Sequence, residues 1–256
     1  MEIVSLELAL EPLFWEHINQ DIPHYYFFAL DWKYNKDATK ILLALEGSQI
    51  FGMMLIYRQS IVQLRGSYNA VKALLEKLDL KKVELLALEQ YKQDILKKYK
   101  PTVSYEIILM TLHEGEEKFQ ETHPVVPLNA TDAEQIAPIM NNADLETWGT
   151  VTNQQIVEEM QNVIWVGIKV ERELVSIGKA RLTEWGGHIG VIATHKAHRN
   201  RGYATSVVSN LVKQIMEKQS LAMIYVDSNN QPAIRAYKKV GFKPYRKYFI
   251  VKGEKK

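Results

Sequence analysis

Apolar runs separated by short polar segments divide the chain into alternating strands and helices. The strands predicted in the second half are Val125–Leu128, Ile164–Val170, Leu174–Leu182, the run from Ile189 to Thr194, and Ala222–Val226. Amphipathic segments predict helices beginning near Asn129 or Thr131, over Thr152–Asn162, and from Tyr203 to about Lys218. The predicted order is strand, two helices, three strands, helix, strand, helix and strand.

The first half shows a related succession of elements. Its predicted strands are Ile41–Leu45, Ile50–Tyr57, Ile61–Leu64, Val83–Ala87 and Val103–Leu112, and its predicted helices are Tyr68–Leu78 and Glu89–Tyr99. Because this order repeats that of the second half, we expect a diverged copy of one fold. Each copy is predicted to be α/β, with a mixed central sheet flanked by helices.

A polar segment separates the two copies. Residues 113–124 are mostly charged or polar, nearly free of aliphatic side chains, and end in a proline. The chain has 256 residues, of which 46% are hydrophobic, so two cores can be buried. The predicted domains are residues 1–116 and 117–256.

Composition excludes several classes of function. The 32 basic and 30 acidic side chains give a net charge of +2, so we expect no nucleic-acid partner. The absence of cysteine excludes disulfides, thiolate metal sites and a cysteine nucleophile. No apolar run approaches the ~18 residues of a membrane span, and the N-terminal run lacks a basic leader. We therefore expect no membrane association and a cytoplasmic location.

The segment from His188 to Ala204 carries the clearest chemical signal. A strand ending at Thr194 leads through Arg199-x-x-Gly202-x-Ala204 into a helix. The first turn of a helix offers unpaired N–H groups and a positive dipole end, and small residues let an anion approach the main chain. The spacing differs from the dinucleotide fingerprint and from the Walker loop. It predicts a diphosphate site.

This pattern resembles motif A of the GNAT superfamily of acyl-CoA N-acyltransferases. A second pattern follows it in the expected order, Asn230-x-x-Ala233-x-x-x-Tyr237-x-x-x-Gly241-Phe242, which is similar to another signature of the superfamily. The resemblance spans roughly residues 125–251. It implies the GNAT fold and acetyl-CoA as cosubstrate, whereas the first half keeps only Arg65-Gly66-Ser67 at the corresponding loop and looks degenerate.

The resemblance also implies a set of coenzyme contacts. The main chain of a strand splayed from its neighbour would bind the pantetheine arm and polarise the thioester carbonyl. The main chain of the first helical turn would bind the diphosphate. The residues implied in coenzyme binding are Ile192, Thr194, Arg199, Arg201, Gly202, Tyr203, Ala204, Thr205 and Asn230. An N-cap role for Asn230 is equally compatible with its place before Pro232.

Catalysis requires a proton donor for the leaving thiolate and, for a lysine-like amine, a base. Tyr237 matches the general acid of the superfamily, and a tyrosine packed on the sheet is the alternative. Glu184 and His188 are candidate bases acting through water, although polar residues at strand ends are also common surface residues. Enzymes of the superfamily that acetylate protein N-termini carry a glutamate where this chain has Tyr225, which disfavours that activity.

The acceptor site is less well defined by the sequence. By resemblance, the segments 144–148 and 245–248 border it, and acidic residues beside an aromatic suit a cationic amine. The aromatic cluster 24–28 is expected in the core or at a domain interface. His195 and His198 lack a third ligand, so we expect a solvated loop and no metal site.

These patterns predict an N-acetyltransferase that acts on a primary amine of a small molecule. A protein or peptide amine is the second choice, and a non-catalytic acyl-CoA-binding module is the rival from another class. The tandem layout resembles the glycine N-acyltransferase and mycothiol synthase groups. The degenerate first domain would shape the acceptor pocket or a homodimer.

Overall fold

The computed structural model describes residues 1–143 and 150–256, and packing divides the chain into two compact units. Unit 1 comprises Met1–Ile108, Asp227–Asn229 and Arg246–Lys256, whereas unit 2 comprises Leu109–Val226 and Asn230–Tyr245. This division departs from the predicted domains 1–116 and 117–256. The difference arises because the C-terminal strand pairs with a strand of unit 1, Phe249 to Glu254 against Lys82 to Ala87.

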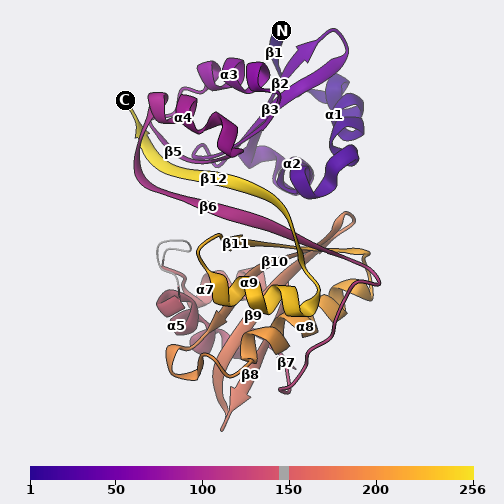
Figure 1. Cartoon of the computed structure of the whole chain (residues 1–256), viewed down its shortest axis with the longest axis vertical. Coiled ribbons are helices and arrows are strands. Elements are labelled where there is room, and N and C mark those ends of the chain that lie inside the picture. Colours follow the sequence, from indigo (N-terminus) through magenta and orange to yellow (C-terminus); the bar gives the residue numbers. More distant parts are fainter. Residues whose placement is uncertain (144–149) are drawn as a thin grey trace. The chain divides into compact units, whose positions relative to one another are not determined.

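Unit 1 consists of a mixed sheet with helices on both faces (Figure 1). Its elements are β1 (Glu2–Ser5), α1 (Glu11–Ile18), α2 (Ile22–Tyr34), β2 (Thr39–Glu46), β3 (Gln49–Tyr57), β4 (Ile61–Gly66), α3 (Tyr68–Lys77), β5 (Lys82–Ala87), α4 (Lys92–Lys98), the first part of β6 (Tyr99–His113) and the last part of β12 (Lys243–Lys255). The strands lie in the order β1-β2-β3-β4-β5-β12-β6. Strands β1 to β4 pair antiparallel, whereas β4 and β5 are parallel.

The predicted strands and helices of unit 1 are present, but its first two helices were not predicted. Helix α2 buries eight of its thirteen residues, among them His24, Tyr25, Tyr26 and Phe28. A helix surrounded by protein lacks the polar face that makes a 3.6-residue period visible in the sequence. The aromatic cluster thus lies in the core of unit 1.

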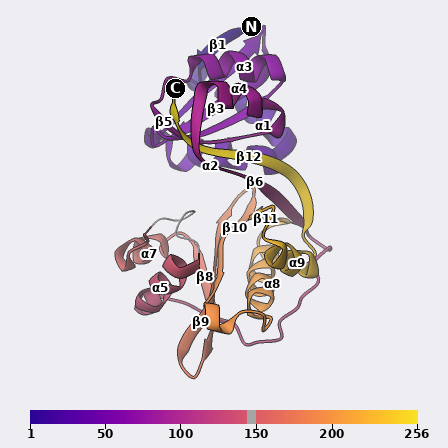
Figure 2. The same ribbon diagram turned by 60° about the vertical axis from the view of Figure 1, so that its left-hand side comes forward.

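Unit 2 repeats this arrangement of elements. It contains the end of β6, β7 (Val126–Pro127), α5 (Ala133–Ala143), α7 (Asn153–Glu159), β8 (Ile164–Val170), β9 (Glu173–Thr183), β10 (Gly186–Thr194), α8 (Tyr203–Met216), β11 (Leu221–Asp227), α9 (Gln231–Val240) and the start of β12. The strand order is β6-β11-β10-β9-β8-β7. Helices α5 and α7 lie on one side of β8–β10 and α8 on the other, beside α9 (Figure 2).

Glycines allow α8 to pack closely on the sheet of unit 2. A Cβ placed at Gly178 would lie 2.5 Å from Val207, and one placed at Gly187 would lie 2.5 Å from Ile215. Val207 and Ile215 both belong to α8. The side chains that precede and follow these glycines therefore point to the opposite face, which carries α5 and α7.

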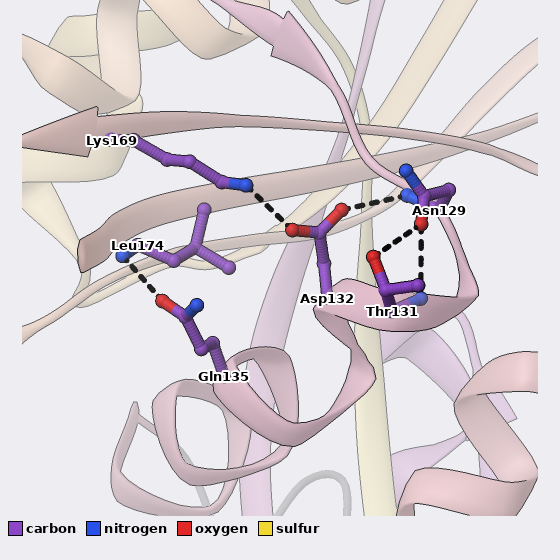
Figure 3. Close-up of polar contacts among 6 residues, drawn as sticks. All are labelled: Asn129, Thr131, Asp132, Gln135, Lys169 and Leu174. Atoms are coloured by element: carbon purple, nitrogen blue, oxygen red, sulfur yellow. Dashed lines mark hydrogen bonds and ion pairs between the residues drawn. The ribbon is translucent and has the colours of Figure 1, made fainter. Parts of the chain in front are cut away.

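A polar network fixes the start of α5 against β8 and β9 (Figure 3). The Asp132 carboxylate accepts hydrogen bonds from the Lys169 ammonium at 2.6 Å and from the Asn129 main chain at 2.9 Å. The Gln135 amide oxygen accepts one from the main-chain N–H of Leu174 at 2.8 Å. Of the two predicted caps, Asn129 and Thr131, the structure has Asn129, which caps the short 3-10 turn (Ala130–Asp132) that leads into α5 and accepts from the Thr131 N–H at 2.9 Å.

The mixed α/β architecture predicted for both halves is confirmed, since each unit runs through strand, two helices, three strands, helix, strand, helix and strand. Across residues 1–143 and 150–256, none of the helices combines the length and the apolar character needed to span a bilayer.

Candidate functional site

The central feature of unit 2 is a place where two parallel strands separate. Strands β10 and β11 pair only from Gly187 to Ile189, opposite Ala222 to Ile224. Beyond Ile189, β10 continues for five residues to Thr194 while β11 continues to Asp227. The β11-facing edge of β10 therefore carries main-chain groups without a strand partner among the described residues.

A bulge marks the point of separation. Residues Ile189 and Val191 of β10 pair with adjacent residues of β9, so Gly190 is the extra residue. Gly190 is exposed, and a Cβ placed on it would meet nothing closer than 3.6 Å. The predicted main-chain contacts, Ile192 and Thr194, lie just beyond the bulge and are half-buried.

The predicted diphosphate loop connects this separated strand to α8. Asn200 and Gly202 have positive φ angles of 61° and 84°, which turn the chain sharply into the helix. Gly202 is the N-cap of α8 and offers no side chain to its first turn. Within the described residues, no acceptor bonds to the main-chain N–H groups of Gly202, Tyr203, Ala204 and Thr205. The loop thus has the free donors and the dipole end that an anion requires.

The basic residues of this loop are exposed, as an anion site needs. The Nε of Arg199 donates to the carbonyl oxygen of Thr194 at 3.3 Å, which holds the guanidinium over the end of β10. The Arg201 side chain is exposed, while its carbonyl oxygen lies 2.8 Å from Nε2 of His123. Ala204 and Thr205 are half-buried and Tyr203 is buried, so the helix start is anchored on its inner side.

Tyr237, the predicted acid, lies in α9 and is 6% exposed. Burial raises the pKa of its phenol above the usual value near 10. The phenol is consequently protonated at neutral pH and can donate a hydrogen bond. Complete proton transfer to a thiolate, whose conjugate acid has a pKa of about 8.5, would be uphill.

Asn230 caps α9. Its side chain accepts a hydrogen bond from the main-chain N–H of Ala233 at 3.2 Å, and Pro232 occupies the first turn. The side chain is exposed at the end of β11, beyond the separation of the strands. The capping role is therefore present, and a coenzyme contact by the same residue stays a prediction.

The two candidate bases occupy different positions along β10. Glu184 is exposed in the turn between β9 and β10, at the end of β10 remote from the bulge. His188 lies two residues before Gly190, with its ring centroid 5.9 Å from that of Tyr225 on β11. Burial lowers the pKa of His188 to about 4, assisted by the charges of Lys179 and Arg181. The imidazole is therefore neutral at pH 7.

A cation and an aromatic ring adjoin the bulge on the face that carries α5 and α7. The Lys179 ammonium bonds the Glu159 carboxylate at 2.5 Å and lies 5.2 Å from the Trp165 ring centroid. Its Cε atom is the nearest neighbour of a Cβ placed at Gly190. Neither Lys179 nor Trp165 was singled out from the sequence, since each belongs to an ordinary strand pattern.

Other predicted surroundings of the site contribute less. The segment 144–148, expected to border the acceptor, lies outside the described residues. The rings of His195 and His198 are 5.7 Å apart, and no group of three metal-ligating side chains is found in the described part of the chain. Of the segment 245–248, Tyr248 is buried in unit 1, where its hydroxyl lies 2.7 Å from Nδ1 of His24. It is therefore a core residue.

Comparison with protein families places a known domain over this site. Residues 165–251 match the family model of the FR47-like protein. The match covers β8 to β12, and so includes the separated strands, the loop before α8 and Tyr237. A search of curated proteins finds no match.

Solved structures extend the likeness to the whole chain. A Drosophila protein superposes with a TM-score of 0.73 at 10% identity, covering 98% of each chain. A GNAT-family acetyltransferase from Colwellia psychrerythraea gives 0.60 at 12% identity, covering 99% of this chain and 100% of the other. A tandem GNAT protein from the clavulanic acid biosynthesis pathway gives 0.53 at 11% identity, covering 85% and 83%. The predicted tandem GNAT fold is confirmed.

Proposed function

We propose that the GNAT-superfamily, FR47-like domain in the C-terminal half of the chain transfers an acetyl group from acetyl-CoA to a primary amine, and that the acceptor is a small molecule. The observation that supports this most directly is the free edge of β10 next to the unbonded N–H groups at the start of α8. An extended amide-containing arm ending in a diphosphate matches both parts.

In this proposal the main chain performs most of the binding. The β10 edge from Gly190 to Thr194 would pair with the pantetheine arm, while the N–H groups from Arg201 to Thr205 would bind the diphosphate. Arg199 adds positive charge over the same loop. A main-chain N–H beyond the bulge would donate to the thioester oxygen, where negative charge develops in the transition state.

The side chains would move protons. The amine attacks the thioester carbonyl, and Tyr237 donates a hydrogen bond to the departing thiolate. The neutral imidazole of His188 would accept the amine proton through water. Because its pKa is lowered to about 4, it would act as a relay to solvent rather than retain the proton.

Binding and turnover test the proposal separately. Acetyl-CoA should raise the melting temperature of the protein, because a ligand that binds only the native state stabilises it. Free thiol should then appear when a panel of small primary amines is added, and peptides with free amines should give less. Failure of acetyl-CoA to bind contradicts the proposal. Binding without thiol release for any amine or peptide would instead support the acyl-CoA-binding module.

A further inference from the structure

The polar segment before β7 is tied to α8 by its main chain. The N–H of Gln120 donates to the Ser209 hydroxyl at 2.8 Å, and the N–H groups of Thr122 and His123 approach the Ser206 hydroxyl at 3.1 and 3.3 Å. Both serines are fully buried. Residues 120–123 therefore form a strap along the first turns of α8, all within unit 2.

The strap ends with a histidine placed on the predicted diphosphate loop. Nε2 of His123 lies 2.8 Å from the carbonyl oxygen of Arg201, and its ring centroid lies 4.5 Å from that of Tyr203. A carbonyl oxygen can only accept, so Nε2 carries the proton and donates. The contact joins residues 78 positions apart in the chain.

This hydrogen bond acts on one peptide group of the loop. In a trans peptide the C=O and the following N–H point in opposite directions, so fixing the Arg201 carbonyl fixes the Gly202 N–H on the other side. Gly202 itself has φ of 84°, and a glycine accepts several orientations of the preceding peptide. Something outside the loop must therefore select one orientation.

We propose that His123 is a positioning residue of the coenzyme site, which holds the Arg201–Gly202 peptide so that the Gly202 N–H faces the diphosphate. This inference rests on the proposed function, because it assigns a role within the same site. It makes the strap part of the anion site, although the strap lies outside both sequence signatures. Coenzyme affinity would then depend on a residue that precedes the FR47-like region by more than forty positions.

The distances around Gly202 exclude a second role for His123, that of shielding the loop. Nε2 of His123 and Oγ1 of Thr122 would each be 3.6 Å from a Cβ placed at Gly202, which is an ordinary contact distance. The strap leaves room for a side chain there, so it does not shield the loop. Its effect is the orientation of one N–H group, a donor whose alignment an anion requires.

The test uses three ligands that divide the coenzyme into parts. Calorimetric titration measures the dissociation constants of CoA, of 3′-phospho-ADP, which keeps the nucleotide and diphosphate but lacks the arm, and of S-acetylpantetheine, which carries only the arm. His123→Ala should weaken CoA and 3′-phospho-ADP by about tenfold, as expected for one charge-assisted hydrogen bond. Binding of S-acetylpantetheine should be unchanged.

Two further variants separate positioning from general damage. His123→Gln keeps an N–H donor and should recover most of the lost affinity, whereas His113→Ala, an exposed histidine at the end of β6, should behave as wild type. Melting temperatures show that each variant is folded. A loss shared equally by all three ligands, or no loss for 3′-phospho-ADP, overturns the role of His123.

The outcome also separates this inference from the proposed function. If His123→Ala weakens CoA selectively while no amine causes thiol release, the positioning role holds and acetyl transfer does not. If His123→Ala binds CoA as wild type does while amines release thiol, the transferase holds and the positioning role is wrong. Absence of CoA binding to the wild-type protein removes both.

Discussion

Both units contain a place where two parallel strands separate, but the space between the strands is occupied by side chains in only one of them. In unit 1, β4 and β5 pair from Ile61 to Gln63 opposite Glu84 to Leu86, and in unit 2, β10 and β11 pair over an equally short stretch. In unit 2 the edge beyond the pairing is free. In unit 1 it is filled by the protein itself.

Arg65 fills the separation in unit 1. Its side chain is completely buried, and Nη1 donates to the carbonyl oxygens of Leu64 at 3.0 Å and Leu86 at 3.2 Å, one on each separated strand. From the other face, the Tyr91 hydroxyl donates to the carbonyl oxygen of Gly66. Three main-chain carbonyl oxygens around the separation are thus already bonded.

The comparison shows that the shared topology alone does not decide whether the strand edge is free. Arg65 pairs with Met53 across β3, next to the Gly52–Gly66 pair, and in unit 2 Val191 pairs with Lys179, next to Gly178–Ile192. An arginine on one strand and a valine on the other occupy equivalent places. The shorter side chain leaves the edge of β10 free.

The largest effect is expected from removing the Arg65 side chain. Arg65 also donates to the carbonyl of His24 and to the Gln63 amide, and its guanidinium lies 4.5 Å from the Tyr248 ring centroid. Arg65→Ala leaves these acceptors unpaired around a cavity, so the free energy of unfolding should fall by roughly 3–5 kcal/mol in urea titration.

Arg58→Ala is the matched control, because Arg58 is exposed in the β3–β4 turn and should change stability by less than ~0.5 kcal/mol. If Arg65 closes unit 1, wild-type protein binds one CoA per chain by calorimetry. A second equivalent of bound CoA in the wild-type protein would mean that Arg65 does not exclude CoA from unit 1.

The next largest effect compares a tyrosine in each unit. Tyr237→Phe should lower kcat for thiol release by roughly ten- to a thousandfold and leave CoA affinity nearly intact, because the phenol acts only on the leaving group. Tyr91→Phe should leave kcat unchanged and cost about 1 kcal/mol of stability through the lost bond to Gly66. Equal kcat values for Tyr237→Phe and wild type would remove Tyr237 from the mechanism.

A third change places an arginine at the strand separation of unit 2, as Arg65 lies at that of unit 1. Gly190 is exposed and open, so Gly190→Arg can place a guanidinium at the bulge without entering the core. We expect CoA affinity to fall about ten- to a hundredfold in calorimetry, because the new side chain competes for the β10 edge. Gly190→Ala should bind nearly as wild type, since its Cβ would be 3.6 Å from the nearest atom. Equal affinities for the two variants would mean that the coenzyme does not use this edge.

The structural features that could be predicted from the sequence are those that depend on residues close together in the chain. The hairpins, the amphipathic helices α3 and α8, and the caps at Asn129 and Asn230 each follow from patterns within a few residues. The pairing of β12 with β5 does not, because it joins Phe249 to Ala87 with no local signal in either strand. For the same reason, the domain boundary predicted at residue 116 did not assign the C-terminal strand to unit 1.

The same distinction applies to the site. The loop from Arg199 to Ala204 predicted an anion site because its spacing is local, and the structure places it directly before α8. A glycine within an apolar strand is a signal for a bulge, so Gly190 was open to prediction. The contacts of His123 and Arg65 were not, since each reaches a partner determined only by tertiary packing.

The smallest predicted effect concerns how each unit fixes its first helices. In unit 1, Asp21 caps α2 and pairs with Arg246 at 3.1 Å, and in unit 2, Asp132 lies at the start of α5 and pairs with Lys169. Burial raises the pKa of Asp132, but the hydrogen bonds from Lys169 and the Asn129 main chain outweigh it and hold the pKa below its usual value.

A lowered pKa in the folded state contributes stability above the pKa of the unfolded chain, about 3.9, and this stability is lost as the pH falls further. Wild-type protein should therefore lose more stability between pH 6 and pH 3 than Asp132→Asn does, by about 1 kcal/mol or less because Lys169 is partly exposed. Urea titrations at both pH values measure the difference. Parallel pH profiles for the two proteins would mean that the charge of this pair does not anchor α5, and that unit 2, unlike unit 1 with its Asp21–Arg246 pair, holds its first helix without an ion pair.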